Sequence, residues 1–190
     1  MPESDGLALS EPPLTTPYLS VVAFDGGLTL KLEPNRFQVT ASGEATPDSD
    51  ATVERIAVRF IQALPHMRYL AVGNNFQRFL AVDDAVAFVR ERFIKSGPWL
   101  SPDSRTVGIS FGYDLDDGLL TLSFDSEFLL EENGDEICQL AGVGIKANFH
   151  RDCTEYPADR QAGAQVGKLP EDRTLLSERL GQLLDGRADT

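Results

Sequence analysis

The chain has 190 residues, of which 17 are Lys or Arg and 30 are Asp or Glu, giving a formal net charge of −13 at pH 7. A hydrophobic fraction of 42% and a charged fraction of 25% are typical of a globular domain and exclude a disordered or collagen-like chain. The acidic balance argues against binding to nucleic acid or to anionic membranes, because both need exposed Lys and Arg.

The sequence lacks the motifs that identify the common metal and cofactor sites. Cys138 and Cys153 form no C-x-x-C pair, and no Cys/His set has the spacing of a zinc site. The glycine-rich loops that hold nucleotides are also absent, so we expect no cofactor. No stretch is apolar enough for a membrane span, and the first seventeen residues lack the features of a secretion signal. We therefore expect a cytoplasmic protein.

The N-terminal part predicts a flexible arm over residues 1–17 and then a three-stranded meander. Asp25-Gly26-Gly27 supplies the positive φ angles of a tight hairpin between a strand at 18–24 and one at 28–33. Leu28, Leu30 and Leu32 alternate with polar residues, which is the pattern of a half-buried strand. A third strand, at 37–41, follows the turn at Pro34-Asn35.

A helix, a strand and a second helix are expected next. Apolar residues from Val53 to Leu64 recur at helical spacing, with Asp50 as the expected N-cap and Pro65 as the end. Residues 67–76 predict a strand. Val82, Val86, Val89 and Phe93 then predict a second helix, with Asp83 or Asp84 at its N-terminal end and Lys95 near its C-terminal end, where the helix dipole favours these charges. Residues 96–105, which include the single Trp99, are expected to connect two halves.

The C-terminal part predicts a second meander followed by a helix. Its expected strands cover 107–113, 120–130 and 137–149, and Asn133-Gly134 is a strong hairpin signal between the last two. Residues 151–168 have no clear period and are expected to be irregular. A last helix is expected from Pro170, ending at Gly186.

The expected order is β-β-β-α-β-α and then β-β-β-α, which defines an α+β fold. Short turns between successive strands indicate antiparallel meanders, and the helices are expected to cover one face of the sheet. We expect one domain over residues 18–190. The repeated order also suggests two similar halves, at 18–95 and 106–190.

One segment has the pattern of a hydrolase nucleophile. Gly108-Ile109-Ser110-Phe111-Gly112 matches G-x-S-x-G, and His150 follows in the order of that family of triads. The pattern requires a sharp turn from strand to helix, whereas Ser110 lies inside an alternating strand. We therefore expect a solvent-facing strand serine.

The acidic segment from Asp114 to Gly118 has carboxylates spaced as at the start of a calcium loop. Its glycine comes one position early for an EF-hand, and position twelve is Asp125 instead of Glu. Asp and Gly are also the common residues of hairpin turns, which is the interpretation we prefer. His66 and His150 each stand at an element boundary, where polar residues are usual.

Charge is distributed unevenly along the chain. Residues 51–100 hold 4 acidic and 7 basic residues, and residues 101–150 hold 10 acidic and 2 basic ones. Such a dipolar chain can attract a protein partner or a second copy, so we expect a small acidic, non-catalytic protein, of bacterial type, that works by protein binding or self-association as a homo-oligomer. The alternative left open is a small hydrolase or ligand-binding enzyme whose site assembles from distant residues.

The segment from Leu64 to Phe76 has the most distinctive composition in the chain, and its sequence allows two interpretations. Its paired asparagines are expected either to form a local turn or to mark a recognition edge. The candidate interaction residues are Arg68, Asn74, Asn75, Arg78, Asp114, Asp116 and Asp117.

Overall fold

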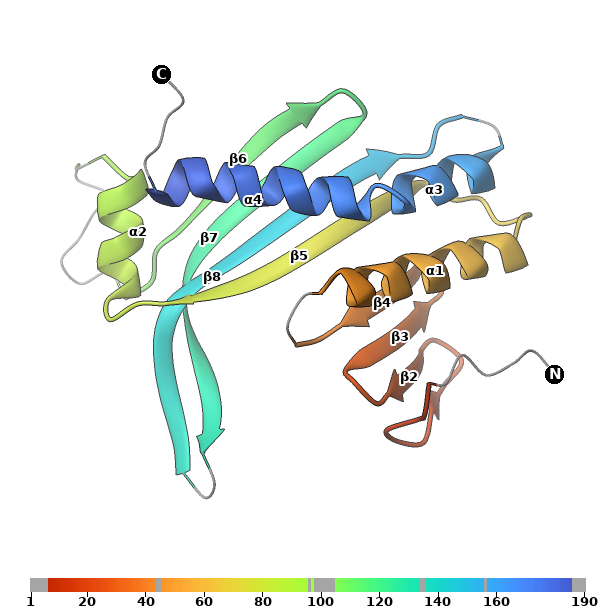
Figure 1. Cartoon of the computed structure of the whole chain (residues 1–190), viewed down its shortest axis with the longest axis horizontal. Coiled ribbons are helices and arrows are strands. Elements are labelled where there is room, and N and C mark those ends of the chain that lie inside the picture. The colour runs from red at the N-terminus through yellow and green to blue at the C-terminus, as the bar shows by residue number, and fades with distance from the viewer. Residues whose placement is uncertain are drawn as a thin grey trace. The chain divides into compact units, whose positions relative to one another are not determined.

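The computed structural model describes residues 7–43, 46–95, 97, 105–133, 136–155 and 157–185. The expected connection at Trp99, the glycine of the Asn133-Gly134 turn and the helix end at Gly186 lie outside these residues. Two antiparallel sheets and four helices confirm the α+β class (Figure 1).

The chain forms two compact units, each with its own sheet. Unit 1 comprises Met1–Leu70 and Cys153–Thr174, and unit 2 comprises Ala71–Asp152 and Leu175–Thr190. Their limits differ from those of the two halves suggested by the sequence. Each unit combines segments distant in sequence, because the C-terminal segment contributes to both.

The sheet of unit 1 is a meander in the order β1-β2-β3-β4. Its strands are β1 (Leu14–Thr15), β2 (Ser20–Phe24), β3 (Leu28–Glu33) and β4 (Arg36–Ala41). Gly26 and Gly27 have φ of 80° and 79°, so the hairpin turn is made as expected. Within the segment expected to be an arm, β1 pairs with β2.

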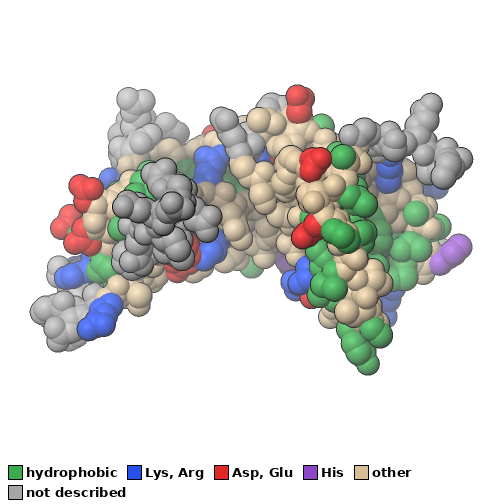
Figure 2. All heavy atoms as spheres, turned by 90° about the horizontal axis from the view of Figure 1, so that it is seen from below, with side chains coloured by type: hydrophobic (Ala, Val, Ile, Leu, Met, Phe, Trp, Pro, Cys, Tyr) green, Lys and Arg blue, Asp and Glu red, His purple; other side chains and the backbone are tan. Residues whose placement is uncertain are grey.

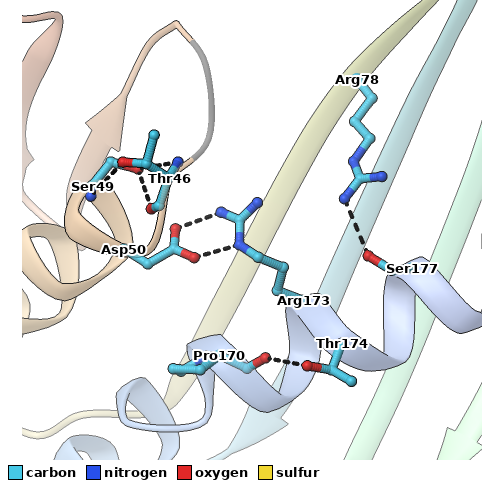
Figure 3. A network of polar contacts seen from close by, with 8 residues as sticks. All are labelled: Thr46, Ser49, Asp50, Arg78, Pro170, Arg173, Thr174 and Ser177. Carbon is cyan, nitrogen blue, oxygen red and sulfur yellow. Dashed lines mark hydrogen bonds and ion pairs between the residues drawn. The ribbon is translucent and has the colours of Figure 1, made fainter.

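Helix α1 (Pro47–Ala63) begins earlier than the sequence indicated. Thr46 is its N-cap: the Thr46 side chain accepts from the Ser49 amide at 3.1 Å, and the Ser49 side chain accepts from the Thr46 amide at 3.0 Å. The expectation of Asp50 as N-cap is wrong, because the Asp50 amide already donates to the Thr46 carbonyl inside the helix. The Asp50 carboxylate instead accepts two hydrogen bonds from Arg173 of α4 (Leu169–Asp185), as Figure 3 shows.

The ring of Phe60 joins α1 to the sheet of unit 1. It stacks on Phe37 of β4 with ring centroids 3.7 Å apart and planes 9° from parallel. We expect Phe60→Ala to lower the free energy of unfolding by about 3 kcal/mol, since the change removes a stacked, largely buried ring. The exposed neighbour Gln62 provides the control, and Gln62→Ala should change stability by less than about 0.5 kcal/mol. Urea titrations of both variants measure this, and equal effects would place the contact face of α1 elsewhere.

Unit 2 contains a second antiparallel sheet, in the order β5-β8-β7-β6. Its strands are β5 (Ala71–Ala81), β6 (Gly108–Leu115), β7 (Gly118–Asn133) and β8 (Glu136–Asp152). The strand expected at 67–76 lies at Ala71–Ala81 instead. The register of β5 with β8 runs without interruption from Ala71 opposite Asp152 to Ala81 opposite Gly142.

Helices cover one face of the unit 2 sheet. Helix α2 (Ala85–Phe93) is capped by Asp84, whose carboxylate accepts from the Ala87 amide at 2.8 Å, and Phe93 contacts Phe111 and Phe124. The second half of α4 covers the same face (Figure 1). From this helix the guanidinium of Arg179 lies 5.3 Å from the ring centroid of Tyr113 of β6. The core is formed by fully buried side chains from the strands and both helices: Leu120, Leu122 and Phe124 of β7, Val143 and Phe149 of β8, Val89 of α2 and Leu176 of α4.

One expectation for the C-terminal part is wrong. Residues 151–168 include helix α3 (Ala158–Val166), which packs against α1 in unit 1. Its period is weak because Ala and Gly make up much of it, yet Ala162 is fully buried and Val166 nearly so. Small residues permit close approach to α1, which the periodicity of large apolar residues does not reveal.

Candidate interaction edge

The seven candidate residues do not form one cluster. Arg68 is exposed in the segment after α1, which belongs to unit 1. Three others, Asn74, Asn75 and Arg78, lie on β5. The remaining three, Asp114, Asp116 and Asp117, lie at the end of β6 and in the turn to β7. Because β5 and β6 are the two outermost strands of the sheet, these last two groups lie at opposite edges.

Asp117 takes part in the fold of unit 2. Its Oδ2 accepts a hydrogen bond of 2.7 Å from Nε of Arg151, whose side chain is only 5% exposed. The guanidinium of Arg151 also lies 5.9 Å from the ring centroid of Phe149. Asp116 is next in sequence but exposed. The two aspartates of this turn therefore have different roles: Asp117 pairs with the buried Arg151, and Asp116 extends into solvent.

The candidates on β5 divide between the two faces of the sheet. Asn74 is buried, at 7% exposure, and Arg78 on the same face donates to the Ser177 hydroxyl of α4 at 3.4 Å (Figure 3). Asn75 lies on the opposite, open face and donates to the Gly73 carbonyl at 3.1 Å. The paired asparagines are thus part of a strand, and a turn at this position is excluded.

The backbone of β5 has one side paired and one side open. The Cys153 amide donates to the Leu70 carbonyl at 2.7 Å, so Leu70 and Cys153 form a hydrogen-bonded pair just before β5 begins. In an antiparallel ladder these pairs recur at every second residue, so the even-numbered residues of β5 bond to β8. The N–H and C=O groups of the odd-numbered residues point away from β8. They are Ala71, Gly73, Asn75, Gln77, Phe79 and Ala81.

We call these backbone groups the β5 edge. Phe79 is partly exposed, and the other five of its residues are exposed. Within the described part of the chain, the edge accepts one hydrogen bond, from the Asn75 side chain to the Gly73 carbonyl. None of the six residues is charged. Proteins usually protect an exposed edge strand with charges, prolines or bulges, and this eleven-residue strand has none of them at its outward positions.

The other edge of the same sheet is different. The Ser126 amide donates to the Val107 carbonyl at 2.9 Å, which by the same argument turns Gly108, Ser110, Gly112 and Asp114 outward. This strand has eight residues and carries a charge at one outward position. The β5 edge is therefore the longer and less protected of the two.

The open face of the unit 2 sheet carries an ion network. The hydrogen bond from Lys146 to Glu127, with the charges of Glu127 and Asp125 beside it, raises the pKa of Lys146 above its usual value. Two glycines make room for these carboxylates, since a Cβ at Gly144 would collide with Glu127 and one at Gly108 with Asp125. The lysine stays protonated and paired at neutral pH, which makes it unsuited to act as a base or nucleophile.

The catalytic pattern is not assembled on this face. Ser110 is exposed on β6, as expected, and its Oγ accepts from Ser123 Oγ at 3.0 Å. His150 lies two strands away and four register positions along β8, a separation of about 10 Å by 13 Å, and its Nε2 is 3.2 Å from Asp152 Oδ1. A serine and a base must be within hydrogen-bond reach, so this pair does not form a triad.

The surface has two depressions large enough to consider as ligand sites. One, of about 460 Å³, is lined by residues of α1 alone, and the other, of about 310 Å³, lies between β5, β8 and α4 and is lined mainly by apolar side chains with Arg78 and Ser177. Within the described residues, no group of three or more His, Cys, Asp or Glu side chains is arranged to hold a metal ion. The polar side chains of the first depression, Glu54, Arg55, Arg59 and Gln62, all come from one helix. Those of the second, Arg78 and Ser177, are hydrogen-bonded to each other. Neither depression therefore has polar groups that converge on an apolar cavity from several elements, as in a small-molecule site.

Exposed apolar side chains occur mostly in unit 1. Figure 2 shows hydrophobic side chains gathered on part of one face, while acidic and basic side chains occur as small separate groups. The large ones that are at least 50% exposed are Leu9, Leu14, Tyr18, Met67 and Leu70. Most of these residues lie outside the regular strands and helices, so no periodic pattern in the sequence indicated their exposure.

The role of Tyr69 was not predicted from the sequence. Its hydroxyl donates to the Leu64 carbonyl at 3.0 Å, near the C-terminal end of α1, and burial together with the charge of Asp159 raises its pKa. The available signal in the sequence was a tyrosine six residues after the last residue of a helix, within reach of the carbonyl groups left open at the helix end.

Comparisons with known proteins give no further assignment. No protein-family model, curated protein or solved structure matches the chain. Among the described helices, none combines the length and the apolar character needed to span a membrane.

Proposed function

We propose that this chain is a cytoplasmic, non-catalytic protein that acts by binding a protein strand along the β5 edge. The observation that carries the proposal is the β5 edge itself. Its strand is eleven residues long, five of its six outward residues are exposed and none is charged, and among the described strands it pairs with β8 alone. An added strand gains affinity from main-chain hydrogen bonds and specificity from the alternate side chains.

The separation of the candidate residues supports the same proposal. Asp117 belongs to a structural ion pair and Arg78 bonds to α4, whereas Asn75 lies exposed at the edge. Its side chain already covers the Gly73 carbonyl, a local protection that a binding strand can displace by supplying a backbone N–H. The alternative, an enzyme with a site built from distant residues, has no comparable support among the described side chains.

The proposal can be tested by photo-crosslinking in cells that express the chain. A photoreactive amino acid replaces Gln77, which is exposed and outward-facing, and in a second strain replaces Lys31 on the unit 1 sheet as a control position. We expect protein adducts from position 77 and far fewer from position 31. Mass spectrometry of the adduct then identifies the bound protein.

A matched pair of variants at Asn75 gives the control for edge binding. Asn75→Pro removes an outward N–H and leaves the ladder with β8 intact, whereas Asn75→Ala keeps the N–H and loses the same side chain. We expect the adduct from position 77 to fall at least about tenfold with proline and to remain with alanine. Adducts that survive proline, or no adducts at position 77, would contradict edge binding.

A further inference from the structure

The side chains of β5 form a self-complementary pattern centred on Phe76. Residues at equal distances on the two sides of Phe76 form pairs: Asn75 with Gln77, which are both amides, and Gly73 with Phe79, of which one has no side chain and the other a large one. The even-numbered residues follow the same symmetry, with Asn74 matched by Arg78 and Val72 by Leu80. The two ends, Ala71 and Ala81, are identical residue types.

We propose that the strand bound at the β5 edge is β5 of a second copy of this chain, antiparallel and centred on Phe76. This inference rests on the proposed edge binding and specifies the partner. A two-fold axis through Phe76 places each residue opposite its match, since an isologous contact pairs residue i with j and j with i. The outward N–H and C=O groups belong to the odd-numbered residues of β5. With the axis at Phe76, each odd-numbered residue faces an odd-numbered residue of the second copy, so every outward N–H donates to and every outward C=O accepts from the second strand.

The hydrogen bonds of this arrangement follow from its register. Six facing pairs of odd-numbered residues exchange two bonds each, about twelve in all. The Gly73 carbonyl, held by Asn75 in the single chain, accepts instead from the Phe79 amide of the second copy. The ring of Phe79 already lies over Gly142 within the unit, and in the pair it faces Gly73, again a residue without a side chain.

Charge and polarity favour this register over its neighbours. Arg78, the one charged residue of β5, faces Asn74 of the second copy, and the two arginines stay four positions apart, about 13 Å along the strands. Moving the centre to Asn75 places Arg78 opposite Val72, and moving it to Gln77 places Arg78 opposite Phe76. Both shifts also shorten the paired strand by two residues.

Cysteine pairing tests the register directly. Asn75→Cys and Gln77→Cys are made separately in a Cys138→Ser background, since Cys153 is buried, and one variant carries a mass tag. Facing residues of an antiparallel pair lie about 5.5 Å apart at Cα, within the range of a disulfide. With the axis at Phe76, mild oxidation of the mixture should give at least about ten times more linked dimer than either variant alone.

Each outcome decides a different part of the proposal. Linked dimer from Asn75→Cys alone, or from Gln77→Cys alone, would shift the axis to that residue and overturn the register. A monomer mass by sedimentation at every concentration would exclude a second copy, while a photo-adduct of another protein at position 77 would leave edge binding intact. Loss of that adduct as well would remove both proposals.

Salt separates backbone pairing from attraction between charges. An edge without outward charges should hold its dimer between 0.1 and 1 M salt, although the screening length falls from about 10 Å to 3 Å. A dimer that dissociates at 1 M salt would instead be held by the uneven charge of the chain, and would contradict the β5 pair.

Discussion

Replacing Phe124 by alanine is expected to lower the free energy of unfolding by about 3–5 kcal/mol, the range for removal of a buried aromatic ring. The Phe124 side chain is fully buried. Its ring contacts Phe93 of α2 and Phe111 of β6, with centroids 4.7 Å and 6.2 Å away. The loss therefore combines the transfer of a ring from water, a cavity and two aromatic contacts.

Leu119 provides the matched control for this substitution. It lies on the same strand but on the open face, where it is 40% exposed, so Leu119→Ala should cost less than about 1 kcal/mol. Urea titrations followed by circular dichroism give the global effect, and hydrogen exchange at the β7 and β8 amides shows which unit loses stability. Similar costs for both variants would mean that the helices do not cover the face that carries Phe124.

The second large effect is expected at Asp117. Asp117→Asn removes the negative charge beside the buried guanidinium of Arg151 and should cost about 3 kcal/mol, because a buried cation that loses its carboxylate retains its desolvation penalty. Asp116→Asn removes the same charge one residue earlier in the same turn, where the side chain is exposed, and should change stability by less than about 0.5 kcal/mol.

This pair of variants also separates fold from binding. If Asp117→Asn destabilises the sheet while the amount of adduct at position 77 stays the same for the folded fraction, the role of Asp117 is structural. Equal effects of the two substitutions on stability would contradict the assignment of the Arg151 pair to the core of unit 2.

The sequence by itself determined those turns, strands and helix ends that depend on residues only a few positions apart. The two glycines after Asp25 fix the first hairpin, because their positive φ angles suit few other residues. Alternation from Val107 to Tyr113 predicted the strand that contains Ser110 and its exposed side. Asp84 lies at the N-terminal end of α2, as expected, and the structure adds that it is the N-cap. These features depend on neighbours a few residues apart, so periodicity and turn chemistry reveal them.

Tertiary structure decided the features that depend on distant residues. Sequence placed a strand after α1, but its position at the edge of the sheet follows from pairing with β8, some seventy residues later. The buried Arg151 beside Asp117 and the α3 contact with α1 also join distant segments. The reason is that these features depend on contacts between segments far apart in the sequence. Whether a strand lies at the edge of a sheet depends on which strands pair with its two sides, and local periodicity does not specify those strands.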